Sequence, residues 1–87
     1  MRLDKFLKVS RIVKRRTVAN EMASAGRIDV NGRRAKPGTD VKVGDVLDIG
    51  YGERRVRVRV LDVREHVRKD EAESLYEVLP DDERSSN

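Results

Sequence analysis

The chain has 87 residues, which is enough for one small domain with a modest core, and its formal net charge is +4. Hydrophobic residues make up 37% of it and charged residues 41%. It has no cysteine, one histidine and no apolar run near the roughly 20 residues that span a bilayer, which argues against disulfides, structural zinc and membrane insertion. We therefore expect a cytoplasmic protein without a metal or organic cofactor.

The first predicted element is a short helix from Arg2 to about Arg11. One apolar face at i, i+3, i+4 spacing is formed by three large side chains: Leu3, Phe6 and Leu7. Asp4 lies in the first turn, where the helix dipole favours a negative charge, and Lys8 follows one turn later. This position favours a role for Asp4 in stabilising the helix. The alternative is that its carboxylate orients a nearby arginine.

A second helix is predicted from about Arg15 to Ala25. Three apolar residues recur on one side at helical spacing: Val18, Met22 and Ala25. Gly26 follows at the expected stop, where a left-handed residue is favourable only for glycine. Three cations precede or begin this helix: Lys14, Arg15 and Arg16. Together with the free backbone N–H groups of a helix N-terminus, they suit a phosphate.

The hydrophobic period then changes from helical to two. Residues 27–30 alternate between charged and apolar side chains and predict a strand. Asn31-Gly32 fits a two-residue turn that needs positive φ at both positions. Residues 33–36 begin the return strand, which Pro37-Gly38 closes.

Two further strands are predicted after a turn at Gly44-Asp45, at Val46–Ile49 and Arg54–Val60. In the second of these, valines alternate with Arg55, Arg57 and Arg59. These arginines either solvate the outer face of the sheet or contact a ligand. The alternation shifts by one residue near Leu61, which suggests a bulge.

The order of elements indicates an α+β domain in which two N-terminal helices pack on one side of a small antiparallel sheet. We assign residues 1–65 to this domain. Residues 66–79 are an extension with a loop or short helix and an edge strand at 75–79. Residues 80–87 form an acidic tail that we expect to be disordered.

The charges are distributed unevenly along the chain. Residues 1–36 hold 11 Lys or Arg and 3 Asp or Glu, whereas residues 65–87 hold 3 and 8. This predicts a polyanion-binding face, and the alternative is an ordinary charged surface.

The chain has no nucleophile motif or phosphate loop, and His66 is its only general base near neutral pH, so we expect no enzyme. With only Phe6, Tyr51 and Tyr76 as aromatics, it cannot build a base-stacking platform, so phosphates, riboses and RNA shape should dominate recognition.

An ordered series of short motifs resembles the S-four RNA-binding domain over roughly residues 1–50. The series is Arg2-Leu3-Asp4-Lys5-Phe6-Leu7, Ser10-Arg11, Lys14-Arg15-Arg16, Ala25-Gly26-Arg27-Ile28, Val30-Asn31-Gly32, Ala35-Lys36-Pro37-Gly38 and Val43-Gly44-Asp45. The resemblance implies two helices followed by a hairpin-rich sheet. It also implies that RNA is held between the entry to the second helix and the hairpin.

Within that superfamily, the length and the opening MRLDKFLKVSR are most similar to the RqcP family of bacterial ribosome-associated quality-control factors. The resemblance implies a monomer that binds large-subunit rRNA and peptidyl-tRNA on stalled large ribosomal subunits. There it would support alanine tailing of the nascent chain with RqcH, a NEMF-family protein. One alternative is the heat-shock family of the same superfamily, whose longer basic C-terminal extension contrasts with the acidic end here. The other is an adaptor that binds an acidic protein.

These considerations define a set of candidate site residues. The resemblance makes Arg2 and Arg16 the leading contacts and Asp4 an orienting residue. The predicted RNA-binding residues are Arg2, Lys5, Lys8, Arg11, Lys14, Arg15, Arg16, Arg27, Asn31, Arg33, Arg34 and Lys36.

Overall fold

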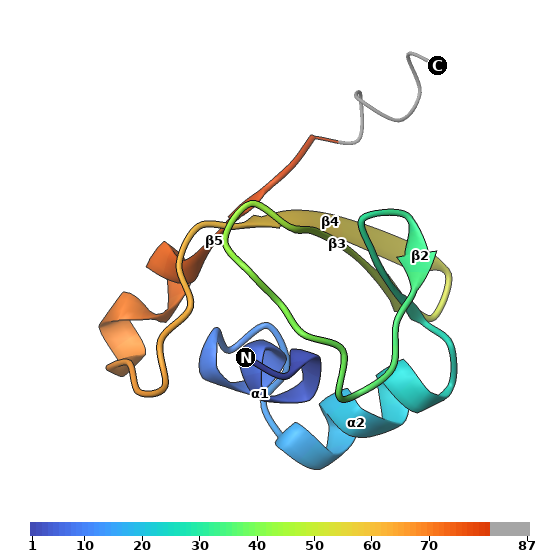
Figure 1. The fold of residues 1–87 in the computed structure, drawn as a ribbon, viewed down its shortest axis with the longest axis horizontal. Helices are drawn as coiled ribbons and strands as arrows, with labels where there is room; N and C mark the ends of the chain where they lie inside the picture. Colours follow the sequence, from blue (N-terminus) through green and yellow to red (C-terminus); the bar gives the residue numbers. More distant parts are fainter. Residues whose placement is uncertain (81–87) are drawn as a thin grey trace.

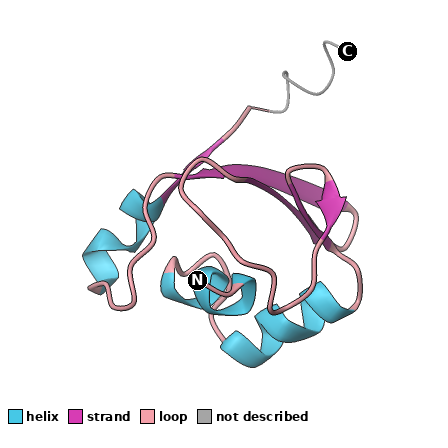
Figure 2. Ribbon diagram, in the orientation of Figure 1, coloured by secondary structure: helices cyan, strands magenta, loops and turns pink. Residues whose placement is uncertain are grey.

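Two helices lie beneath a curved five-stranded antiparallel sheet in a computed structural model of the chain, which describes residues 1–80 (Figure 1). The strands are arranged in the order β2-β1-β3-β4-β5. Figure 2 shows that the helices are all on one side of the sheet and leave its other face uncovered. The predicted α+β class and the helix-on-sheet packing are confirmed. The predicted acidic tail lies, except for Pro80, outside the described residues.

Helix α1 (Leu3–Val9) is shorter than predicted, and its N-terminus is completed by a distant loop. Arg2 occupies the N-cap position, and its side chain makes no capping hydrogen bond to the helix backbone. Instead, the Leu3 N–H donates to the carbonyl of Thr39 at 2.8 Å, and the Asp4 N–H donates to that of Pro37 at 3.1 Å. The loop therefore provides acceptors for donors that the first turn of any helix leaves free.

The C-terminal end of α1 turns sharply. Ser10 is the cap residue, is fully buried, and donates its hydroxyl to the carbonyl of Leu7 at 3.2 Å. Arg11 follows with φ of 63°, in the left-handed region that glycine usually occupies after a helix. This turn ends α1 two residues earlier than its apolar spacing predicts.

Helix α2 (Arg16–Ser24) packs against α1 through small residues. Ala19 and Ala23 are buried, whereas Val18 is 40% exposed. Val18 and Ala25, which lie on one side of the helix at apolar spacing, are therefore not the residues that face the core. Alanine side chains allow two short helices to approach closely, and the larger valine is left at the margin. Gly26 ends the helix with φ of 78°, as predicted.

The hairpin is formed by β1 (Ile28–Val30) and β2 (Arg33–Arg34). Asn31 and Gly32 between them have φ values of 53° and 83°, so the predicted turn with two positive φ angles is confirmed. Strand β1 also pairs with β3 (Val46–Tyr51), which is two residues longer than predicted.

The second half of the sheet continues from β3 to β4 (Arg54–Val60) and β5 (Tyr76–Val78). A 3-10 helix, η1 (Lys69–Leu75), precedes β5 and lies beside α1 on the helical side (Figure 1). Strand β4 ends at Val60, after which the N–H groups of Leu61 and Asp62 both donate to the Leu75 carbonyl. The alternation that shifts at Leu61 thus marks the end of the strand.

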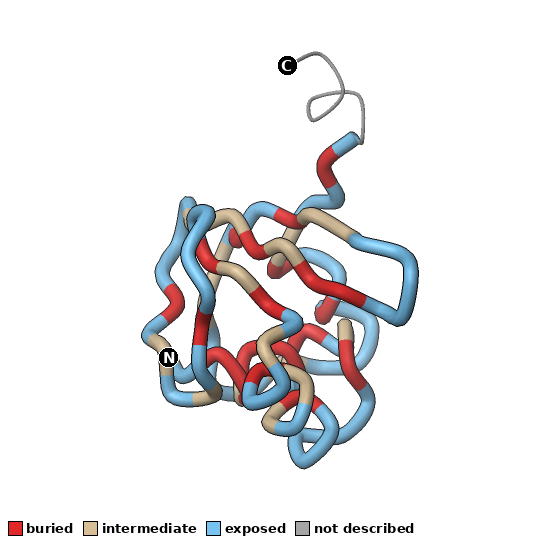
Figure 3. The backbone as a smooth tube through the Cα atoms, turned by 90° about the vertical axis from the view of Figure 1, so that its right-hand side faces the viewer, coloured by how far each residue is buried: buried red, intermediate tan, exposed pale blue. Residues whose placement is uncertain are grey.

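The core lies between the two layers (Figure 3). Its largest fully buried side chains are Phe6, Leu3, Leu7, Ile28, Leu47, Ile49 and Leu75. The inward residues of β3 and β4 alternate with outward charged residues, as the period of two requires. The core fixes α1 beneath the sheet and so determines where the cations at its two ends lie.

Candidate nucleic-acid interface

A buried carboxylate organises the N-terminal end of α1. Asp4 is 2% exposed and accepts hydrogen bonds from both Nε and Nη2 of Arg2, at 3.1 and 3.2 Å. Arg16 Nη2, from the start of α2, donates to the same carboxylate at 3.3 Å. Asn20 Nδ2, one helical turn later, donates to its other oxygen at 3.3 Å. We call these four residues the Asp4 cluster.

The Asp4 carboxylate is strongly stabilised in its charged form. Burial alone would raise its pKa, but hydrogen bonds from Arg2 and Asn20 and the positive charges of Arg16 and Arg2 outweigh burial. The result is a pKa lowered from 3.8 to about 2. Asp4 therefore remains an anion at neutral pH and holds both guanidinium groups.

Both arginines remain available to a ligand. Their side chains are 54% and 48% exposed for Arg2 and Arg16, while the Asp4 side chain is 3% exposed. A guanidinium has five N–H donors, and the bonds to Asp4 use only some of them. The remaining donors point from a fixed position toward solvent, an arrangement that suits bidentate binding of phosphate.

The Asp4 cluster shows which role of Asp4 the structure supports. Asp4 makes no ion pair with Lys8, one turn later in α1, because Asp4 is turned toward α2 and its partners are Arg2, Arg16 and Asn20. The hydrogen bonds from Arg2 and Arg16 favour the alternative, in which the Asp4 carboxylate orients arginines. Asn20 was not predicted, although its i, i+4 spacing from Arg16 places both on one face of α2.

The loop that follows the hairpin lies against this cluster. Pro37 and Thr39 bind the first turn of α1, and Arg2 forms an isolated β-bridge with Asp40. The guanidinium of Arg2 lies over Gly38, with atoms 3.7 Å from the point that a Cβ on this glycine would occupy. Figure 1 shows this loop descending from β2 to the helices. The exposed side chain of Lys36 begins the loop, so hairpin and helix cations are brought toward each other.

Other predicted hairpin residues have internal partners. Arg34 Nε donates to Asp29 at 3.2 Å, and its side chain lies against Gly26 at the end of α2. The Asn31 amide donates to Asp45 at 3.0 Å and accepts from the Val46 N–H at 2.9 Å. The hydrogen bonds of Asn31 thus hold the hairpin against the turn at Asp45–Val46. Within residues 1–80, no ion pair engages Lys14, Arg15, Arg27, Arg33 or Lys36, and all five are exposed.

The remaining cations of the first segment are separated from the Asp4 cluster. Lys5 forms an ion pair with Glu65, the last residue assigned to the domain. Lys8 and Arg11 lie near the other end of α1 and line a depression with Glu65, His66 and Val67. Arg2 therefore lies at one end of α1, whereas Lys8 and Arg11 lie at the other.

The outer face of the sheet is electrically balanced. Arg55 pairs with Asp48 at 2.7 Å, and Arg59 pairs with Glu77 at 2.8 Å on the neighbouring strand. Arg57, between them, is partly buried and also has an interaction partner. These pairs support the interpretation in which the arginines of β4 solvate an outer face.

Two kinds of site are not found in the part of the chain that the structure describes. Residues 1–80 contain no group of three or more His, Cys, Asp or Glu side chains that could hold a metal ion. Within the same residues, no helix is long and apolar enough to cross a membrane.

The fold and the paired arginines define a small module with a cationic, anion-binding surface. Residues 1–47 match the S4 domain family. The chain belongs to that family, because the match covers more than half of its length and close relatives align over most of theirs.

Two relatives share the name RQC P-site tRNA stabilizing factor. The protein from Halalkalibacterium halodurans is 60% identical over 90% of this chain and 89% of its own length. The protein from Bacillus subtilis is 49% identical over 94% of this chain and 95% of its own length. A heat shock protein 15 homolog from Aeromonas salmonicida is 37% identical over 88% of this chain and 59% of its own length.

Solved structures show the same fold. Heat shock protein 15 from Vibrio cholerae, described as trimeric, has a TM-score of 0.86 and 29% identity, covering 98% of this chain and 87% of that one. The solution structure of the hypothetical protein HP1423 has a TM-score of 0.78 and 29% identity, covering 92% and 98%.

Proposed function

We propose that this chain is a cytoplasmic, non-catalytic RNA-binding factor of ribosome-associated quality control. It binds large-subunit rRNA and peptidyl-tRNA on stalled large ribosomal subunits, and the Asp4 cluster supplies its central RNA contact. The exposed cations of the α2 entry and hairpin extend that contact. It stabilises the tRNA position while RqcH, a NEMF-family protein, adds alanine residues to the nascent chain.

The observation that carries this proposal is the pair of half-exposed arginines held by one buried carboxylate. An arginine on a surface normally loses side-chain entropy when it binds a phosphate. Here Asp4 fixes Arg2 and Arg16 beforehand, so less entropy is lost on binding. The names of the relatives that are 60% and 49% identical support tRNA stabilisation as the role of the contact.

The second candidate function is that of the heat-shock family, a factor for large subunits blocked by peptidyl-tRNA. The likeness to heat shock protein 15 in sequence and fold favours it. The two functions share the RNA surface and differ in the partner. Alanine tailing reconstituted with RqcH, with and without this chain, separates them, because only the quality-control function increases tailing.

The proposed contact is tested with the double variant R2A/R16A. We expect binding to large subunits that carry peptidyl-tRNA to weaken at least about tenfold, since two charge-assisted contacts are lost. Co-sedimentation at a series of salt concentrations measures this, and the salt dependence of the wild type should be steep. Circular dichroism verifies that both proteins are folded.

The matched control is R54A/R64A. It removes the same amount of charge from two exposed positions that are distant in sequence from the Asp4 cluster. This control should bind within about twofold of the wild type, because a change in net charge alone is a weak effect at physiological salt. Equal binding of R2A/R16A and the control would refute the proposed contact.

Binding to an acidic protein but not to subunits would favour the adaptor alternative. Light scattering after size-exclusion chromatography tests our proposal that the free chain is a monomer.

A further inference from the structure

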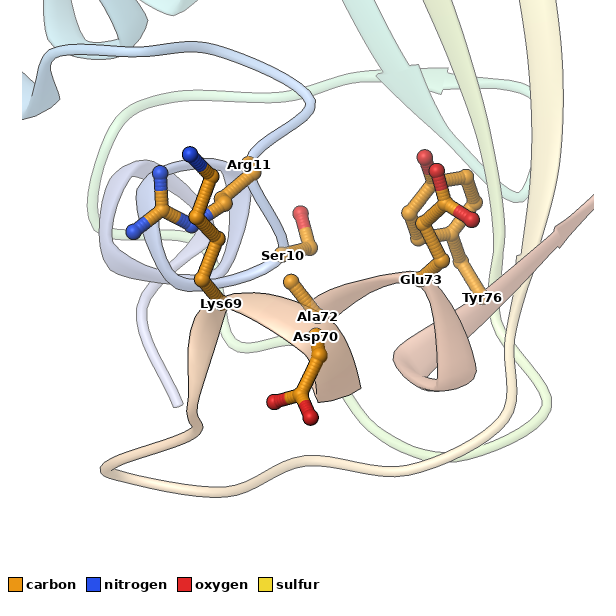
Figure 4. A pocket seen from close by; sticks show the side chains of 7 residues that line it. All are labelled: Ser10, Arg11, Lys69, Asp70, Ala72, Glu73 and Tyr76. Carbon is orange, nitrogen blue, oxygen red and sulfur yellow. The ribbon is translucent and has the colours of Figure 1, made fainter.

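A second surface lies at the far end of α1, away from the Asp4 cluster. It is a depression of about 580 Å³ between the last turn of α1, the helix η1 and the start of β5 (Figure 4). Its lining residues are Ser10, Arg11, Lys69, Asp70, Ala72, Glu73 and Tyr76. Of these, only Arg11 belongs to the set expected to bind RNA. A volume of this size is typical of small-molecule sites.

One wall of the depression is cationic. Figure 4 shows the side chains of Arg11 and Lys69 extending to the same side of the depression from distant parts of the sequence. Neither makes an ion pair or side-chain hydrogen bond among the described residues, and both are exposed. The Asp70 carboxylate, although adjacent in sequence to Lys69, points away from them. Two unpaired like charges lining one hollow disfavour each other, and an anion would relieve that repulsion.

The backbone at Arg11 adds to this argument. Its φ of 63° is unfavourable for a residue with a long side chain, and glycine or asparagine is the usual occupant after a helix. Non-glycine residues in this conformation cluster at ligand-binding positions. The arginine therefore occupies a position where glycine would favour folding.

The opposite wall is aromatic and acidic. Tyr76 begins the edge strand β5, is partly exposed, and lies beside Glu73 in Figure 4. Burial, and then the charge of Glu73, raise the pKa of the tyrosine, which is consistent with their proximity. Ala72 also lines the depression; it is buried and has a small side chain. A ligand that is only an anion does not suit this aromatic and acidic wall.

We propose that this depression binds one unpaired nucleotide of the RNA, with its phosphate between Arg11 and Lys69 and its base stacked on Tyr76. Glu73 accepts a hydrogen bond from an N–H group on the edge of the base. Three aromatic residues are too few for a platform that stacks several bases, but the partly exposed side chain of Tyr76 is enough for a single base. Stacking on tyrosine and phosphate contacts to cations are the usual means of binding unpaired bases. The inference rests on the proposed RNA binding and adds a second contact, at the other end of α1 from the Asp4 cluster. The domain then holds two RNA segments at once.

The phosphate contact is tested with the double variant R11Q/K69Q. The probe is a fluorescently labelled single-stranded oligouridine, and anisotropy measures its affinity. We expect about tenfold weaker binding and a less negative salt slope, because two phosphate contacts are lost. The control R54Q/R64Q removes the same charge elsewhere and should stay within about twofold of the wild type.

The base contact is tested separately with Tyr76→Leu and Tyr76→Phe. An oligouridine and the same backbone with abasic riboses are compared for each protein. The wild type and Tyr76→Phe should prefer the oligomer with bases by about fivefold or more, whereas Tyr76→Leu should lose that preference. Phenylalanine keeps the ring, so it controls for packing against the core. Amide NMR shifts of the wild type on titration should concentrate at residues 10–11 and 69–76.

The outcomes distinguish this inference from the proposed function. If R11Q/K69Q binds single-stranded RNA as tightly as its control, or if Tyr76→Leu keeps the base preference, the nucleotide site is wrong. Weakened subunit binding by R2A/R16A would then still support the Asp4 cluster. If R2A/R16A binds subunits normally while R11Q/K69Q loses the oligouridine, the nucleotide site stands and the proposed central contact fails. Thermal unfolding establishes that each variant is folded.

Discussion

Replacing Asp4 by asparagine removes the charge that holds Arg2 and Arg16 while preserving size and one acceptor oxygen. The pKa of Asp4 is lowered from 3.8 to about 2. The gap between these values corresponds to about 2.5 kcal/mol of stability at neutral pH. Because the two arginines are half exposed, solvent screens part of this interaction. We therefore expect D4N to lose about 1 to 2 kcal/mol at pH 7, equivalent to roughly 5–10 °C in Tm.

The direction of the pKa shift determines how the stability difference between wild type and D4N changes with pH. The carboxylate is more acidic in the folded than in the unfolded protein, so its contribution is complete above about pH 4. It is lost as the pH falls through the folded-state pKa of about 2, below which both states are protonated. The difference in unfolding free energy between wild type and D4N should therefore be constant from pH 7 to pH 5 and shrink below pH 4.

Urea unfolding followed by circular dichroism at pH 7, 5, 4 and 3 measures this difference. The control is D70N, because the Asp70 side chain is 79% exposed and lies 4.0 Å from its ion partner Arg68. Its unfolding free energy should equal that of the wild type within about 0.5 kcal/mol. A D4N protein as stable as wild type at pH 7 would refute the reasoning, as would a deficit that persists undiminished at pH 3.

Three further substitutions test local features, each by urea unfolding at pH 7. Gly26→Ala should destabilise by about 1 to 2 kcal/mol, because φ is 78° and the new Cβ would meet Arg34 Nη1 at 2.5 Å; unchanged stability would contradict this. Asn31→Ala should cost about 1 to 2 kcal/mol, because it removes both side-chain hydrogen bonds to the turn at Asp45–Val46, and a neutral result would mean that water replaces them. Arg11→Gly should stabilise the fold by about 0.5 to 1 kcal/mol while weakening single-stranded RNA binding, and a less stable variant would show that the left-handed turn carries no strain.

Features governed by neighbouring residues could be predicted from the sequence. The turn at Asn31-Gly32, the stop at Gly26 and the alternation in β4 follow from backbone preferences and a period of two, and all three are found. The buried face of α2 could not be predicted in the same way. Spacing alone does not show that Ala19, rather than Val18, faces α1, because this depends on how closely the two helices approach.

The site was predictable only in part, for a related reason. Charge density indicated the basic set and the family resemblance singled out Arg2 and Arg16, but the partners of Asp4 depend on packing between α1, α2 and the loop after the hairpin. The depression that Arg11 lines depends on η1 folding back beside α1. No periodic signal in residues 66–74 indicates that contact. Long-range packing therefore turns one basic segment into two distinct surfaces.

The carbonyl groups that complete the first turn of α1 also determine when the surface around Arg2 can exist. Those acceptors belong to Pro37 and Thr39, and the Val41 N–H donates to the carbonyl of Met1 at 2.7 Å. During translation, the arginines at the beginning of the chain can therefore take up their final positions only after residues 37–41 have left the exit tunnel. A nascent fragment that ends before the hairpin carries the charges without the geometry.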